Sequence, residues 1–337
     1  MDGREITRRA IEFDTPPRLP FFLGSFWNDR LNAQIANFPN DVWDCWEMDR
    51  QEAGWFFDNP APDDWGCKWK TTEVKNMGQV VFHPLEDWSK LSTYRPPDPK
   101  NPFYFVRVED TIKNSGGRYV VITVHFNLIE RLEMLHGFKR TLEDFYLEPE
   151  KIHRVLDMIL EYKIAHLDEA ARRLDGRVHG IFLTDDWGTQ QNTFVSPDIF
   201  KEFFFDRYKQ LFDSIHGHGW HVMLHSCGKV NKFVPFFIDL GADVLNMQQP
   251  RTYGIKEIGD SFGGKVCFLT TVDIQATLPE GDPDAVQAEA RELVRNWSIQ
   301  AGGFIVFNYG DSESIGTTDE ISEIMFKAFY DLREYWK

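Results

Sequence analysis

The segment Leu224-His225-Ser226-Cys227-Gly228 places a histidine and a cysteine two residues apart at the end of an apolar run. If a strand continues through both, the imidazole of His225 and the thiol of Cys227 point to the same side. Imidazole and thiolate are both good zinc ligands, and a catalytic zinc usually takes three protein ligands. The pair therefore predicts part of a metal site, against the alternative of a polar turn in which both side chains are merely packed.

The third metal ligand has to come from another strand end. Asp311 follows the last predicted strand, and we take it as the third ligand. Tyr309 and the pair Asp185 and Asp186 are alternatives at the same face. Cys267 has suitable chemistry but lies about 13 Å below the end of its strand, at 3.3 Å per residue, so core packing is the favoured interpretation for it.

Asp185 and Asp186 end another predicted strand. Adjacent residues leaving a strand point to opposite sides, so at most one carboxylate faces the barrel centre while the other caps a helix or bonds to the backbone. A carboxylate at the barrel mouth can orient a substrate, act as a general base or bind a metal. The candidate catalytic residues are therefore Asp185, Asp186 and Tyr309.

The segment from Ser25 to Pro102 is rich in Trp and Phe set among Pro, Asp and Asn. Most of these rings are expected to form a local hydrophobic core under a long loop. Others would line a flat apolar pocket for a ring-shaped substrate. The candidate substrate-binding residues, from this segment and from strand ends, are Trp27, His125, Trp187, Gln190 and Asn246.

These side chains need a frame that gathers several strand ends. From about residue 118 onward, short β-branched runs alternate with helical patterns, which is typical of βαβ units on a parallel sheet. With Leu19–Leu23 and Gln79–His83 before them, the strands total eight, the number that closes a (β/α) barrel. The six predicted strands after residue 118 are Tyr119–Phe126, Val178–Thr184, His221–His225, Ala242–Met247, Val266–Val272 and Phe304–Phe307.

We therefore predict an α/β fold, a (β/α)8 TIM barrel formed by residues 1–337 as a single domain. Residues 25–102 would be an N-terminal insertion that covers the barrel mouth. Helices are expected from Pro149, after Ser196-Pro197, after Asp282-Pro283 and from Thr317 or Thr318, because Ser, Thr and Asp cap helices and Pro suits the first turn. An open doubly wound sheet is the alternative.

The composition excludes several classes of protein. The chain has 337 residues with 37 Lys+Arg against 53 Asp+Glu, a net charge of −16, which argues against nucleic-acid binding. It shows no apolar signal core and no run of 18 apolar residues, so a cytoplasmic protein without a membrane partner is expected. Its four scattered cysteines do not suggest a disulfide framework. No dinucleotide, Walker or nucleophile-elbow motif occurs.

Together these blocks resemble the uroporphyrinogen decarboxylase superfamily, and within it the corrinoid-linked methyltransferases with O-demethylase-like members. The most specific elements are the His-X-Cys-Gly block and the preceding Asp-Asp-X-Gly block. The resemblance covers nearly the whole chain and includes Arg4-Glu5 to Pro20, Asp185-Asp186-Trp187-Gly188, Ser196-Pro197, His225-Ser226-Cys227-Gly228, Gly241 to Asn246 and Thr271-Val272-Asp273.

The resemblance implies a (β/α) barrel and, in the methyltransferase branch, zinc bound by His-X-Cys and a distant Cys near the last strand. That second Cys would fall around Tyr309–Asp311 and is absent. Asp311, Tyr309, Cys267 or an earlier acid would replace it, or the chain has a different zinc site or none. The true decarboxylases are less similar, because residues 21–27 lack their Arg-rich stretch.

The resemblance therefore implies methyl transfer from a small O-methyl donor, such as an aromatic methyl ether, or from an N-methyl donor. The acceptor would be the cobalt of cobalamin on a separate corrinoid protein, because the chain has no Asp-X-His-X-X-Gly element. Zinc would polarise the ether oxygen, and Asp185, Asp186 or Tyr309 would supply or steer a proton. The alternatives are a cofactor-independent decarboxylase or lyase acting on a small carboxylated substrate and a non-enzymatic binder of a planar ligand.

Overall fold

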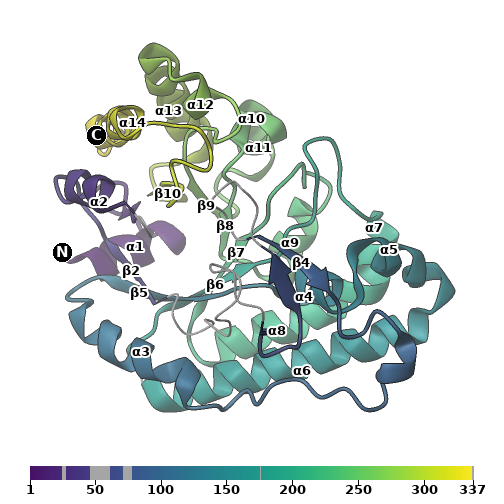
Figure 1. The fold of residues 1–337 in the computed structure, drawn as a ribbon. Helices are drawn as coiled ribbons and strands as arrows, with labels where there is room; N and C mark the ends of the chain where they lie inside the picture. The colour runs from purple at the N-terminus through teal and green to yellow at the C-terminus, as the bar shows by residue number, and fades with distance from the viewer. Residues whose placement is uncertain (25–27, 46–60, 71–77, 175, 336–337) are drawn as a thin grey trace.

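Eight parallel strands surround a common axis and form a nearly closed barrel (Figure 1). The computed structural model describes residues 1–24, 28–45, 61–70, 78–174 and 176–335. The order around the ring is β1-β10-β9-β8-β7-β6-β5-β2. The strands are β1 (Phe21–Phe22), β2 (Val42–Asp44), β5 (Tyr119–Val124), β6 (Gly180–Thr184), β7 (His221–His225), β8 (Val244–Asn246), β9 (Cys267–Thr270) and β10 (Phe304–Phe307). The predicted TIM barrel is confirmed.

The first and last strands of this order, β1 and β2, meet through Asp41. Its amide donates to the Phe21 carbonyl at 2.8 Å, and its carboxylate accepts from the Phe21 amide at 2.9 Å. The guanidinium of Arg18 holds the same carboxylate through two bonds of 2.7 Å. The bidentate ion pair, together with the two backbone contacts, fixes the place where the barrel closes.

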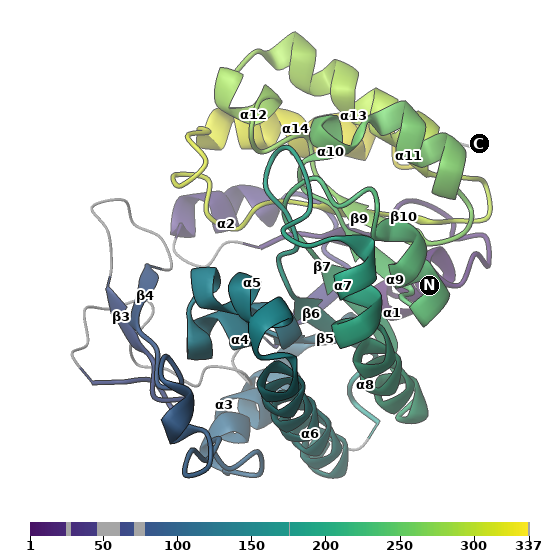
Figure 2. The ribbon, with the colours of Figure 1, turned by 90° about the vertical axis from the view of Figure 1, so that its right-hand side faces the viewer.

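One strand assignment from the sequence is wrong. Gln79–His83 does not enter the barrel, because β4 (Gln79–Phe82) pairs antiparallel with β3 (Lys68–Lys70) in a separate two-stranded sheet. The barrel strand is instead β2, which lies within the aromatic-rich segment and pairs in parallel with β5. Figure 2 shows the β3 and β4 pair beside α4 and α5, on the side of the molecule away from the N-terminus.

Helices cover the outside of the barrel. The predicted caps are confirmed at Ser196, Asp282 and Thr318, each of which accepts a hydrogen bond from a backbone amide in the first turn of its helix. The α-helices are α1 (Gly3–Ile11), α2 (Asp29–Ile35), α3 (Phe103–Thr111), α4 (Leu128–His136), α5 (Phe138–Leu147), α6 (Pro149–Leu174), α7 (Pro197–Phe200), α8 (Asp206–Gly217), α9 (Val234–Leu240), α10 (Pro250–Tyr253), α11 (Ile255–Phe262), α12 (Thr277–Glu280), α13 (Pro283–Trp297) and α14 (Asp319–Asp331). Single 3-10 turns span Trp88–Lys90 and Ile112–Asn114, and a π-helical stretch, Lys201–Phe205, joins α7 to α8.

The barrel interior is a packed core of its own, distinct from the larger core between sheet and helices. Alternate strand residues such as Val121, Met223 and Leu269 fill it, and Ile11 of α1 joins them. Cys267 is fully buried there, which confirms its expected packing role. Among the described helices, none is both long and apolar enough to span a membrane.

Candidate metal centre

Three side chains with metal-binding atoms converge at the carboxyl ends of β6 and β7. They are Asp186, His225 and Cys227, and one ligand atom of each lies within 4.8 Å of the others. The thiol of Cys227 is 3.3 Å from Nε2 of His225, and Oδ1 of Asp186 is 3.5 Å from the same nitrogen. All three side chains are partly exposed. The predicted pairing of His225 with Cys227 is therefore present in the fold.

The pairing of β6 with β7 explains how Asp186 reaches the other two. Thr184 lies opposite His225 in the parallel register, so Asp186 follows two residues later on the same side of its chain. The amide of Cys227 donates to Oδ1 of Asp186 at 2.7 Å. The loops beyond are held together by a bond of 2.7 Å from the Lys229 amide to the Thr189 carbonyl.

Asn246, at the end of the neighbouring strand β8, contacts the imidazole of His225 at Nδ1, the nitrogen that does not face Cys227. Its Oδ1 lies 2.7 Å from Nδ1 of His225, and its Nδ2 donates to the Leu269 carbonyl at 2.9 Å. Asn246 is buried. The sequence suggested substrate binding for Asn246, whereas the structure places its amide between two protein groups.

Asp185 points away from this cluster and caps helix α4. Its carboxylate accepts from the amides of Leu128, Ile129 and Glu130 at 2.8 to 3.1 Å, and also from the hydroxyl of Tyr208. Burial raises the pKa of Asp185 to about 6 against the opposing effect of these hydrogen bonds. The expectation that one of the two carboxylates caps a helix is confirmed, and the capping residue is Asp185.

Two further ionisable groups stand near the cluster. Burial, with the charges of Cys227, Asp311 and Asp186 adding to it, raises the pKa of the Tyr309 phenol. Burial and then the charge of Asp186 raise the pKa of Glu130 well above its ordinary value. Each shift favours the protonated form of its group, which is the form that can donate a proton.

Three phenylalanine rings lie in the barrel interior beneath His225. Phe22, Phe182 and Phe307 contact one another with ring centroids 5.3 to 6.5 Å apart, and the centroid of Phe182 is 6.4 Å from that of His225. We call these three rings the aromatic floor, and Phe182 is the member whose contact with His225 joins it to the cluster. An apolar group bound against this floor would contact aromatic rings.

A carboxylic acid is also present on the interior side of the barrel, at Asp44 of β2. It alternates with Val42, which belongs to the interior core, and it accepts from the hydroxyl of Thr123 at 2.8 Å. Burial raises the pKa of Asp44 to about 7. A protonated acid here could donate a hydrogen bond to a bound molecule.

The remaining predicted site residues are not drawn into the cluster. Asp311 caps a turn, because its Oδ1 accepts from the Ser314 amide at 3.2 Å. Trp187 is fully buried among rings of the helical layer, so we reassign it from substrate binding to core packing. His125 follows β5 and presents its carbonyl to Lys163, and Gln190 is exposed on the loop after β6. Trp27 lies outside the described residues.

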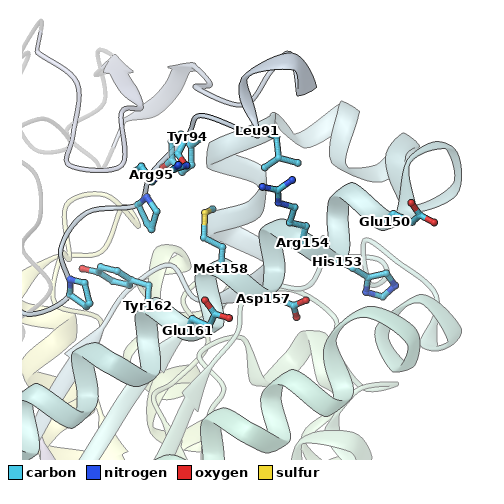
Figure 3. A pocket seen from close by; sticks show the side chains of 12 residues that line it. Leu91, Tyr94, Arg95, Glu150, His153, Arg154, Asp157, Met158, Glu161 and Tyr162 are labelled. Carbon is cyan, nitrogen blue, oxygen red and sulfur yellow. The ribbon is translucent and has the colours of Figure 1, made fainter.

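A cavity of about 760 Å³ is present elsewhere, between the segment 91–99 and the outer face of α6 (Figure 3). Charged side chains of both signs line it, among them Arg95, Arg154, Asp157 and Glu161. Its lining includes no residue of the metal-binding cluster. The cavity is therefore separate from the metal-binding cluster.

Sequence reasoning missed several groups at the barrel mouth. Phe182 and Phe307 lie on predicted strands, and two-residue alternation backward from Thr184 would have placed Phe182 inside the barrel. The residues around Glu130 carried no comparable signal, because the position of Glu130 near the cluster depends on how α4 packs against β6. Asp44 was missed since no strand was predicted around it.

The donor set of the cluster fits a zinc ion. Imidazole, thiolate and carboxylate are all zinc ligands, and three protein ligands with a remaining open position are the pattern of catalytic zinc. Burial, with the charges of Asp186 and Glu130 adding to it, raises the pKa of the Cys227 thiol. A cation bound here would therefore have to displace the thiol proton.

Comparisons with known proteins bear on the fold and the family of this chain. The structure of a methyltransferase from Methanosarcina mazei is similar to this chain, with a TM-score of 0.73 at 15% sequence identity over 98% of this chain and 99% of that one. The catalytic domain of an endo-β-1,4-mannanase from Bacillus sp. JAMB-750 matches at a TM-score of 0.48 and 10% identity, over 98% and 89%. A search of curated protein sequences found no match. The model of the uroporphyrinogen decarboxylase (URO-D) family matches residues 61–331, and the chain belongs to this family.

Proposed function

We propose that this protein is a methyltransferase that moves a methyl group from a small O-methyl or N-methyl donor to the cobalt of a corrinoid carried by a partner protein. The observation that carries the proposal is the convergence of Asp186, His225 and Cys227 at the mouth of a barrel of this family. The likeness of the whole chain to the structure of the methyltransferase from Methanosarcina mazei supports the same choice.

We propose that Asp186, with His225 and Cys227, completes a zinc site in place of Asp311. The donor atoms of these three side chains lie together, whereas the carboxylate of Asp311 is engaged by its own turn. A zinc ion held there would supply Lewis acidity to the heteroatom that carries the methyl group. Catalytic zinc sites with three protein ligands keep a further position for such a heteroatom.

When the methyl–oxygen bond of an ether donor breaks, the oxygen leaves as an anion, so it needs a proton. Tyr309 and Glu130 are the candidate donors near the cluster, because burial raises the pKa of each and so favours its protonated form. We propose Tyr309 as the proton donor, since a phenol already keeps its proton at neutral pH at an ordinary pKa of about 10, and burial raises that pKa further. Asp185 would hold α4 and take no direct part.

The aromatic floor of Phe22, Phe182 and Phe307 favours a donor with an apolar or aromatic body. A methoxylated aromatic ring would pack against these rings in a stacked or edge-to-face arrangement, and its ether oxygen would point toward His225. Asp44, whose pKa burial raises to about 7, could hold a polar substituent of such a donor when it is protonated. We therefore place methyl ethers of aromatic compounds first among the candidate substrates.

The cobalt has to approach the methyl group from the open side of the barrel. A corrinoid protein docked at the mouth would bring it there, and the chain itself contributes no corrinoid-binding motif. Strongly reduced cobalt and free thiols both require a reducing compartment, and all four cysteines are free. We propose that the protein acts in the cytoplasm.

The test is to incubate the zinc-loaded protein with reduced free cobalamin and a panel of methoxylated aromatics, and to follow methylation of the cobalamin by absorbance. Wild-type protein should demethylate at least one donor, and Asp186→Asn and Tyr309→Phe should be slower. If no methoxylated or N-methylated donor reacts while a carboxylated aromatic releases CO₂, the decarboxylase alternative replaces this proposal.

A further inference from the structure

We infer that Asn246 is a positioning residue that fixes His225 in the tautomer whose Nε2 is free to bind a metal. The inference rests on the metal site in the proposed function and goes beyond it, because it assigns the protonation of each imidazole nitrogen. It follows from a short series of hydrogen bonds in which one backbone carbonyl decides the orientation of every group after it.

The carbonyl of Leu269 starts the series. A carbonyl oxygen can only accept, so the atom of the Asn246 amide that faces it at 2.9 Å must be the nitrogen. Oδ1 of Asn246 therefore points the other way. The Leu269 carbonyl thus determines which end of the Asn246 side-chain amide is nitrogen and which is oxygen, an assignment that the shape of the amide alone does not give.

Oδ1 of Asn246 then fixes the imidazole. It lies 2.7 Å from Nδ1 of His225, and an amide oxygen cannot donate, so Nδ1 carries the hydrogen. Nε2 of Gln248 donates to the same oxygen at 2.7 Å, and this is the shorter of its two contacts, since it lies 3.4 Å from Nδ1 of His225. In neutral His225 the lone pair is consequently on Nε2, the nitrogen that faces Cys227 and Asp186 at 3.3 and 3.5 Å.

Burial gives this arrangement its strength. Asn246 is 1% exposed and Gln248 7%, so water does not compete for the shared oxygen. The imidazole thus needs no rotation or proton shift before binding a cation. Partners of this kind behind a metal-bound histidine are worth about 10- to 100-fold in metal affinity.

The first measurement uses the full chain labelled with ¹⁵N-histidine and stripped of metal with a chelator. Long-range ¹H–¹⁵N correlation spectra report which imidazole nitrogen carries the hydrogen, and His225→Gln identifies the signals of His225. Wild-type protein should show the hydrogen on Nδ1. A hydrogen on Nε2 would overturn the inference, and this result needs neither a variant of Asn246 nor any catalytic activity.

The second measurement is zinc affinity by competition with a chromophoric chelator. Asn246→Leu should lose about 10- to 100-fold, whereas Asn246→Asp should keep most of the affinity, because a carboxylate oxygen also accepts from Nδ1–H. Asn231→Leu is the matched control. It removes a similar hydrogen bond, from the side-chain amide of Asn231 to the Tyr253 carbonyl at 2.8 Å, which does not involve His225.

Wild-type affinity in a folded Asn246→Leu protein would overturn the inference, and so would an equal loss in Asn246→Asp. The two proposals fail separately. Absence of methyl transfer with an Nδ1–H tautomer and tight zinc would refute the function alone, while an Nε2–H tautomer in an active enzyme would refute the role of Asn246 alone.

Discussion

Replacing Gly228 by alanine should separate the two loops that carry the proposed metal ligands. Gly228 has a φ of +84°, and a Cβ added to it would lie 2.1 Å from the carbonyl oxygen of Gly188. Gly188 follows Asp186 by two residues, and Gly228 follows Cys227 directly. The contact is therefore backbone against backbone, between the two segments that must stay together for the ligand cluster to exist.

The expected magnitude has two parts. The left-handed backbone costs an alanine about 1 kcal/mol relative to glycine. The overlap adds more, because the loops would have to part by about 1.3 Å, from 2.1 Å to the 3.4 Å of an ordinary contact. Overpacking of this kind costs about 1–3 kcal/mol. The total loss of unfolding free energy should be about 2–4 kcal/mol.

The assay is urea denaturation together with zinc competition on Gly228→Ala and on Gly116→Ala. Gly116 also has a positive φ, +61°, but its added Cβ would meet nothing within 4 Å. The control should lose only about 1 kcal/mol and bind zinc normally, while Gly228→Ala should bind zinc at least about tenfold more weakly. Equal losses in the two variants, with zinc binding intact in both, would refute the reasoning.

Three further outcomes follow from single side chains. Asp185→Asn should lower the unfolding free energy by about 2 kcal/mol or more, because α4 loses a charged cap, and an unchanged urea midpoint would contradict this. Burial, with the charge of Arg4 adding to it, lowers the pKa of His179 to about 4, and its Nδ1 accepts from the Val120 amide. The unfolded chain then binds the extra proton first, so stability should hold above about pH 6.5 and fall below it toward pH 4 by up to about 1.4 kcal/mol per pH unit. Urea unfolding at several pH values checks this, and an equally steep loss in His179→Gln would count against it. Phe182→Leu should raise KM for an aromatic donor more than it lowers kcat, since the floor contacts ground and transition states alike, and steady-state kinetics with an unchanged KM would exclude the floor from binding.

Local pattern was sufficient where one strand or one helix decides the outcome. The spacing of His225 and Cys227 predicted two neighbouring ligands, because strand alternation alone aligns them. The adjacent pair Asp185 and Asp186 predicted one cap and one mouth-facing carboxylate for the same reason. Both expectations depend only on residues within a few positions of each other.

The third ligand candidate could not be singled out in this way, because the sequence left Asp186 as one alternative beside Asp311. Asp186 reaches His225 because β6 pairs with β7 and because the loops that follow pack backbone to backbone at Gly188 and Gly228, a contact between segments about forty residues apart. Asp311 also follows a strand, and nothing in its spacing distinguishes it from Asp186. The difference lies in the hydrogen bond that the Ser314 amide makes to Asp311.

Two other misassignments have physical causes. Gln79–Phe82 does form a strand, but the apolar pattern of a strand does not say which sheet it joins. The true barrel strand, Val42–Asp44, has only three residues, too few for a periodic signal. Trp187 was taken for a pocket residue by type, yet it lies in the core of the helical layer.

The most direct test of the central claim is the zinc content of purified protein by mass spectrometry, compared with Cys227→Ala, Asp186→Ala and Asp311→Ala. The account predicts near-stoichiometric zinc in the wild type and in Asp311→Ala, and its loss in the other two. Zinc retained in Asp186→Ala but lost in Asp311→Ala would contradict the proposed ligand set, and a folded wild type that takes up no zinc would contradict the metal site itself.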